Sequence, residues 1–171
     1  MKPSAGLSPK PGLALKSRAV LFMILAYVGT IVALLVVSDT LRARWILLTA
    51  HCTAWFLDLL GAEGRSYGSM VTSIYGSVDI IYECTGVFPL ILLTSAFAAF
   101  PSEWRSKLIG LSLALPFMLA LNQLRILSII YLGVLVPESV DTIHHIVWPA
   151  IILFCTSLVF IAWARNARRA G

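Results

Sequence analysis

The chain has 171 residues, of which 59% are hydrophobic and only 12% are charged. Soluble domains carry about a quarter charged residues, and long uncharged stretches separate the few charges here. This composition excludes an ordinary soluble enzyme and predicts an integral membrane protein, because lipid penalises charge and offers no water to unsatisfied polar groups. The net charge of +5 comes from short basic clusters beside apolar segments. Such clusters are typical of membrane-helix flanks, so we expect a lipid bilayer and no nucleic acid as partner.

The N-terminal part predicts a tail followed by a membrane anchor. Residues 1–18 hold four basic side chains among Pro, Gly and Ser, which indicates a disordered basic tail. Residues 19–37 carry no charge and are long enough to cross a bilayer core of ~30 Å at ~1.5 Å per residue. A cleaved signal peptide is the alternative, but its apolar core usually has about 7–15 residues. We therefore expect an uncleaved anchor.

The rest of the chain predicts a helix, an extended segment and three further spans. Residues 40–60 interrupt an apolar pattern with charges, as in an amphipathic helix lying in the interface. Residues 61–82 are rich in Gly, Ser and Tyr and indicate a short extended or hairpin segment outside the lipid. Apolar spans follow at residues 86–100, 108–136 and 146–163.

These segments predict an all-α polytopic helix bundle with about four spanning helices, an interfacial helix and a short extracytoplasmic extended segment. We expect a single membrane-embedded domain over residues 19–165, with basic cytoplasmic tails at residues 1–18 and 166–171. In this topology the loop with Arg105 and Lys107 is cytoplasmic, as the positive-inside tendency requires. The protein is thus expected in the cytoplasmic membrane, as a multi-pass protein.

Three reactive side chains share one membrane depth on the outer side. Cys84 stands at the outer mouth of the second span, His144 stands at that of the last span, and Arg125 lies ~27 Å along its helix. A guanidinium inside a span costs at least ~2.5 kcal/mol, so it needs a function or a partner. Asn122 shares its helical face at i−3. The structural alternatives are that Arg125 snorkels to the outer interface or pairs with a carboxylate such as Glu83.

The three cysteines have different expected roles. Cys52, Cys84 and Cys155 have spacings that predict no disulfide framework. Cys155 lies deep in an apolar span, and buried cysteines often serve as small hydrophobes. A thiol at a helix N-terminus near a cation has a lowered pKa, which we expect for Cys84.

Two adjacent histidines precede the last span. His144 or His145 can serve as general base for a thiol and later protonate the leaving amine, and spacing does not choose between them. Asp141 can orient His144 if the turn between them is helical. A metal or haem site is a weaker alternative, because its candidate ligands show no helical i, i+4 spacing, and we expect no metal and no cofactor. Those ligands are His51, Cys52, Cys84, His144 and His145.

Together these motifs resemble a known family. Cys84-Thr85-Gly86, then Asn122-x-x-Arg125 about forty residues later, then a histidine four residues before Trp148, is similar to the exosortase/archaeosortase family of membrane transpeptidases. The closest resemblance is to the short exosortase H type. It covers roughly residues 30–165, and it includes the stretches 99–110 and 121–133.

The resemblance implies a role for each residue and for the protein. Cys84 would be the nucleophile, Arg125 the essential arginine and His144 the histidine. Asn122, Glu83, Asp141 and His145 remain supporting candidates. The family recognises a C-terminal sorting signal on exported proteins, made of a short motif, a transmembrane helix and a basic tail. It implies a cysteine-type peptidase or transpeptidase that cleaves this signal at the outer membrane face. The alternative is a non-enzymatic membrane assembly or transport subunit.

Overall fold

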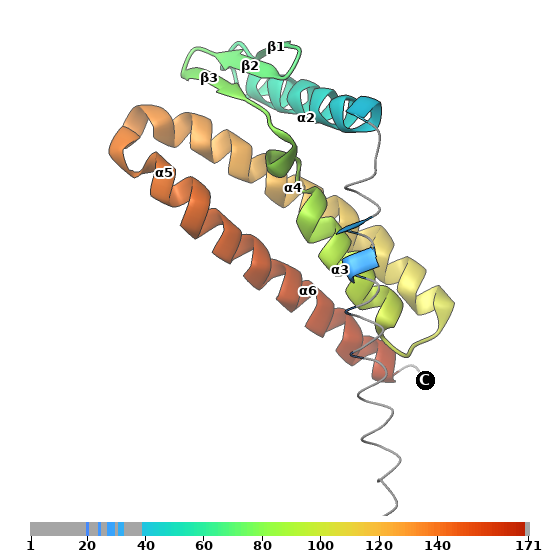
Figure 1. Ribbon diagram of the computed structural model, residues 1–171. Coiled ribbons are helices and arrows are strands. Elements are labelled where there is room, and N and C mark those ends of the chain that lie inside the picture. The colour runs from blue at the N-terminus through green and yellow to red at the C-terminus, as the bar shows by residue number, and fades with distance from the viewer. Residues whose placement is uncertain (1–19, 21–23, 25–26, 30, 33–38, 170–171) are drawn as a thin grey trace, which may run out of the picture.

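The structure is a computed structural model, and it describes residues 20, 24, 27–29, 31–32 and 39–169 (Figure 1). The described positions before residue 33 are helical. The predicted tail at residues 1–18 and most of the predicted anchor at residues 19–37 lie outside the described residues.

The described part is mostly helical, with a small sheet near its start. Its elements are α2 (Asp39–Leu59), β1 (Arg65–Tyr67), β2 (Met70–Ser73), β3 (Gly76–Asp79), the 3-10 turn η1 (Tyr82–Thr85), α3 (Val87–Ala99), α4 (Trp104–Leu135), the 3-10 turn η2 (Pro137–Ser139), α5 (Val140–Thr142), the π turn η3 (Ile143–Val147) and α6 (Trp148–Arg169). The last helix continues past residue 165, where we expected the C-terminal tail to begin.

Within the described residues, two stretches of helix are long and apolar enough to cross a membrane. They are Trp104–Leu135 and Pro137–Ala167, with 32 and 31 residues. Helix α3 occupies the expected span at residues 86–100, but it has only 13 residues. That is about 20 Å at 1.5 Å per residue, which is less than the ~30 Å of a bilayer core. The structure therefore confirms two of the expected spans, and the number of about four stays a prediction.

Helix α2 and the sheet form a cap at one end of α4 (Figure 1). The strands are antiparallel in the order β1-β2-β3, and Val71 pairs with Ser66 on one side and Val78 on the other. Val71 is fully buried with Leu57 of α2, in a cluster that also contains Ile126 of α4. The expected extended segment is thus present as three short strands. The buried side of α2 consists of Thr49, Ala50, Thr53, Ala54 and Leu57.

The other end of the molecule holds α3, α4 and α6 together through aromatic packing. Phe97 of α3 stacks on Trp163 of α6 with 4.0 Å between ring centroids. The indole N–H of Trp163 donates to the carbonyl of Ser106 on α4 at 3.0 Å. A Cβ at Gly110 would lie 2.5 Å from both aromatic rings, so glycine lets the three helices approach closely. This packing fixes the direction in which α4 and α6 run toward the cap.

Candidate active site

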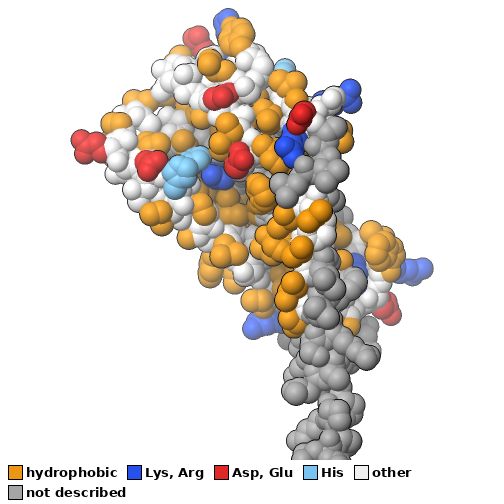
Figure 2. All heavy atoms as spheres, in the orientation of Figure 1, with side chains coloured by type: hydrophobic (Ala, Val, Ile, Leu, Met, Phe, Trp, Pro, Cys, Tyr) orange, Lys and Arg blue, Asp and Glu red, His pale blue; other side chains and the backbone are white. Residues whose placement is uncertain are grey.

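Three side chains from separate elements meet below the cap. Cys84 lies in η1, Arg125 in α4 and His144 in η3. The Sγ of Cys84 is 4.0 Å from Nε2 of His144. The same Nε2 is 3.5 Å from a terminal nitrogen, Nη2, of Arg125. Figure 2 shows histidine side chains at this level of the surface, with a basic side chain and several acidic ones beside them.

The backbone of Cys84 is held by a turn and by α4. Thr85 Oγ1 donates to the carbonyl of Tyr82 at 2.6 Å, which closes the 3-10 turn. Gly86 follows with φ of 78°, a left-handed conformation that ends the turn and lets α3 begin. From α4, the buried Asn122 donates through Nδ2 to the carbonyl of Cys84 at 2.9 Å. The nucleophile candidate is therefore fixed from both sides.

The contact between Asn122 and the turn leaves no space for a side chain at Gly86. A Cβ at Gly86 would lie 2.9 Å from Cγ of Asn122. Asn122 Oδ1 is buried and has no hydrogen-bond partner among the described residues. The amide is therefore oriented by a single hydrogen bond and by close packing against the glycine.

Arg125 reaches the site from the third turn before the end of its long apolar helix. A guanidinium only donates, so its contact assigns an unprotonated Nε2 to His144 and places the proton of the neutral ring on Nδ1. The Nε of Arg125 is buried and has no partner in the described part of the chain. The lone pair at Nε2 thus faces both a donor from Arg125 and the thiol of Cys84.

Burial governs the protonation of the thiol. Cys84 is 8% exposed, and desolvation raises its pKa above the usual value, although the charge of Arg125 opposes the shift. The carboxylates of Glu83 and Asp79 raise the pKa further. Our expectation of a lowered pKa is therefore wrong, because loss of water at this buried position outweighs the nearby cation. The thiol is the resting form.

A family model for transmembrane exosortases, Exosortase_EpsH, matches residues 7–168. This match covers nearly the whole chain, including all three converging side chains. The chain belongs to the transmembrane exosortase family. The family resemblance seen in the sequence is thereby confirmed. No curated protein and no solved structure matches the chain.

The supporting candidates lie differently in this exosortase. Glu83 is exposed and forms no ion pair with Arg125 among the described residues, so the alternative of a structural pairing is not seen there. Asp141 lies 3.4 Å from Nε2 of His145, which is four positions later in the chain. We had expected Asp141 to orient His144, but its partner is His145. The side chain of His145 is 67% exposed and turned outward.

The metal alternative finds no set of ligands in the described part of this exosortase. No group of three His, Cys, Asp or Glu side chains there is placed to hold one ion. His51 instead bonds the carbonyl of Leu47 within α2 at 2.7 Å. The three cysteines are free thiols.

Two features of the exosortase site were not anticipated from the sequence. One is the close approach of Gly86 to Asn122, which needs the packing of η1 on α4 to be known. The other is the π turn that carries both histidines. Pro149, just after this turn, was the available signal, because a proline N lacks the proton that an α-helix needs.

Proposed function

We propose that this exosortase is a membrane cysteine transpeptidase that cleaves a C-terminal sorting signal of exported proteins at the outer face of the cytoplasmic membrane. The observation that supports it best is the position of His144 Nε2, within 4.0 Å of the Cys84 thiol and 3.5 Å of Arg125. A nucleophile, a base and a fixed positive charge around one point are what acyl transfer requires.

The first half of the reaction forms a thioester. His144 takes the proton of the Cys84 thiol at Nε2 while the sulfur attacks the scissile carbonyl, so a C–S bond forms and the carbonyl oxygen becomes an oxyanion. The C–N bond then breaks, and the imidazolium gives its proton to the leaving amine. Because the resting thiol is protonated, a base is needed at the moment of attack.

Arg125 acts on the oxyanion. Once His144 accepts a proton, its Nε2 can no longer accept from Arg125, and the two cations repel each other. The guanidinium is then free to donate to the oxyanion, through a terminal nitrogen or through Nε, which has no partner among the described residues. Donors aimed at such an oxyanion are commonly worth about 3–4 kcal/mol of transition-state stabilisation.

The second half of the reaction resolves the thioester. An acceptor amine from the cell surface attacks the carbonyl, and His144 takes the amine proton. The C–S bond then breaks, and the imidazolium returns the proton to the sulfur, which restores the thiol and the neutral ring. Water can replace the amine and gives hydrolysis instead. The substrate's own transmembrane helix brings its motif to the depth of Cys84, so that a bimolecular search becomes a positioned encounter.

The membrane orientation that we propose puts the cap outside and the α3–α4 loop in the cytoplasm. Arg105, Lys107 and Arg165 lie at the end away from the cap, and cytoplasmic loops carry the excess of basic residues. The basic tail of a sorting signal would then remain on the cytoplasmic side while its motif reaches the site outside.

The proposal is tested by co-expressing a candidate substrate with wild-type enzyme and with Cys84→Ala, Arg125→Ala or His144→Ala. We expect each change to abolish trimming of the substrate's C-terminus, measured by mass spectrometry. Matched controls are Cys155→Ala, Arg105→Ala and His51→Ala, which should retain processing. Trimming that continues in the Cys84→Ala protein would refute the proposed transpeptidase activity and favour a non-enzymatic membrane assembly or transport role.

A further inference from the structure

The two adjacent histidines have different surroundings. His144 faces Cys84 and Arg125, whereas His145 contacts Asp141 on the outside. Their rings touch edge to face with centroids 4.6 Å apart. A small rotation of the turn that carries them would therefore exchange which ring faces the thiol.

The segment that carries both histidines is a π turn, and this geometry determines the direction in which each ring points. The N–H of Trp148 donates to the carbonyl of Ile143, five residues back, instead of four as in an α-helix. A π turn thus holds one residue more than an α turn, and single π turns inside helices are frequent at functional sites. Changing it into an α turn would move the preceding residues by about one position. His145 would then take approximately the direction that His144 has now.

Pro149 opposes the α alternative. In an α-helix the N–H of residue 149 would donate to the carbonyl of His145, but proline has no N–H and its ring crowds that carbonyl. Pro116 lies inside α4, where the helix stays α, so a proline alone does not create a π turn. At residues 143–147 the contacts of His144 on the inside and His145 on the outside favour the wider turn as well.

We propose that Pro149 and the π turn determine which histidine faces Cys84, and that Pro149 is therefore a positioning residue for His144. The catalytic meaning of this choice depends on the proposed function. The geometric claim does not, because proximity to the thiol is measurable without any reaction.

Proximity can be measured by cross-linking with a short bifunctional thiol reagent. The background carries Cys52→Ser and Cys155→Ser and keeps Cys84, and each variant adds either His144→Cys or His145→Cys. With Pro149 present, we expect the His144→Cys variant to form the cross-link between position 144 and Cys84. The His145→Cys variant should form the corresponding cross-link far less. Adding Pro149→Ala should shift the ratio toward 145 by at least about tenfold, since an internal proline disfavours an α turn by roughly a hundredfold.

Pro116→Ala is the matched control, because it removes a proline from the neighbouring helix without touching the turn. It should leave the cross-linking ratio as it is. An unchanged ratio in the Pro149→Ala protein, with the fold retained by thermal melting, would overturn the proposal.

A second variant keeps the proposal testable if Pro149→Ala does not fold. Deleting Ile146, which is 65% exposed, removes the extra residue of the turn, so an α turn then presents position 144 in its original direction. We expect the deletion to keep cross-linking at 144 with either residue at 149. Preference for 145 after the deletion would contradict the account.

Substrate processing supplies the catalytic half of the test. With Pro149 present, His144→Ala should abolish trimming and His145→Ala should retain it. With Pro149→Ala, His145→Ala should lower trimming by at least about tenfold, the same shift as in cross-linking. If the cross-linking ratio shifts but trimming is unchanged by Cys84→Ala, the proposed function fails and the geometric inference stands. If trimming needs Cys84 but the ratio does not shift, only the inference fails.

Discussion

Cys84 is a nucleophile candidate kept neutral by its surroundings. Burial raises the pKa of its thiol, and the guanidinium of Arg125 lowers it by less. A cysteine in such surroundings holds no preformed thiolate, so its reactivity toward small reagents is low until a base or substrate arrives. The arrangement protects the thiol from adventitious modification.

This protonation state has a measurable pH dependence. We expect the rate of Cys84 alkylation by iodoacetamide, in a Cys52→Ser/Cys155→Ser protein, to rise with pH at a midpoint above that of a free cysteine peptide. The ionised thiolate is the reacting form, and burial delays its appearance. Arg125→Gln removes the opposing charge and should move the midpoint further upward. A midpoint below that of the peptide would show that the cation dominates.

The glycine after the nucleophile is constrained by conformation and by space together. Gly86→Ala should destabilise the fold by more than the about 1–2 kcal/mol that a left-handed backbone costs an L-residue, because the new Cβ would also press on Asn122. Gly68→Ala is the matched control, with φ of 66° and open space around it. Thermal melting in detergent should show a larger loss for Gly86→Ala. Equal losses of thermal stability in the two variants would mean that Asn122 moves away from the new Cβ at no cost in free energy.

The grouping of Cys84, Arg125 and His144 was foreseeable, because membrane depth follows from position along apolar segments. Two properties of the same residues could not be derived from membrane depth. The thiol pKa depends on how much water the cap removes from Cys84. Spacing alone did not choose His144 over His145, because that choice depends on a π turn with no periodic pattern in the sequence, and only the family resemblance pointed to His144.

Helix α4 carries the site at one end and the aromatic packing at the other. Gly110→Ala should destabilise the protein by about 1–3 kcal/mol, the usual cost of overpacking, because its Cβ would lie 2.5 Å from Phe97 and Trp163. Gly133→Ala is the control on the same helix, with nothing within 4 Å. It should be neutral or stabilising by up to about 1 kcal/mol. The midpoint of thermal unfolding distinguishes the two, and a neutral Gly110→Ala would contradict this packing.

Long apolar helices were predicted well and short elements less so. The span expected at residues 108–136 is α4 at Trp104–Leu135, because a long apolar run predicts a helix even where a few polar residues and a proline interrupt it. The segment at residues 61–82 contains three strands whose register depends on contacts with α2. Helix α3 at Val87–Ala99 agrees with the apolar run at residues 86–100 within one residue at each end, because Gly86 and Phe100 bound it with non-helical backbone.

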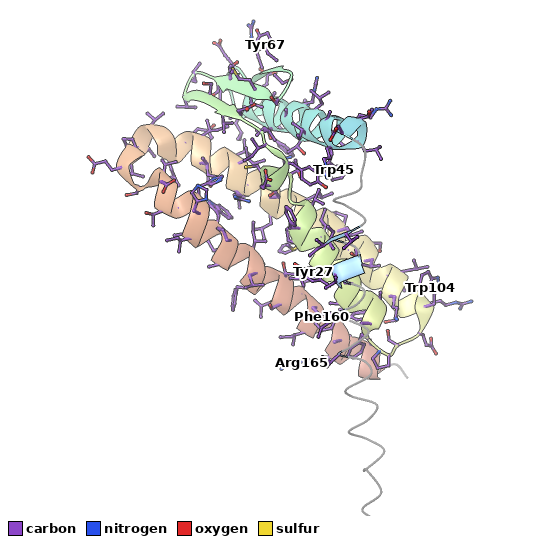
Figure 3. All side chains as sticks on the ribbon, in the orientation of Figure 1. Tyr27, Trp45, Tyr67, Trp104, Phe160 and Arg165 are labelled. Atoms are coloured by element: carbon purple, nitrogen blue, oxygen red, sulfur yellow. The ribbon has the colours of Figure 1, made fainter. Side chains whose placement is uncertain are left out.

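The molecule has two unlike ends, and the proposed orientation in the membrane rests on this difference. Tyr67 of the sheet marks one end, and Trp104 and Arg165 mark the other (Figure 3). The apolar surfaces of α4 and α6 lie between these ends. Such a distribution fits a protein that exposes its cap on one side of a bilayer and its basic loops on the other.

Labelling of intact cells tests this orientation. In a protein with all three cysteines changed to serine, Tyr67→Cys should react with a membrane-impermeant maleimide, and Arg165→Cys should react only after the cells are opened. Both positions are exposed, so accessibility to the reagent depends on the side of the membrane. The reverse pattern would place the cap in the cytoplasm and refute the proposed outward-facing site.

The most direct measurement of the central claim is the intact mass of the purified enzyme after brief mixing with substrate. If the thiol of Cys84 forms an acyl-enzyme beside His144 and Arg125, the protein should gain the mass of the substrate's N-terminal fragment. Hydroxylamine should release that mass, and Cys84→Ala should not gain it. Trimmed substrate appearing at an unchanged rate with Cys84→Ala, and no adduct on the wild-type enzyme, would contradict the account.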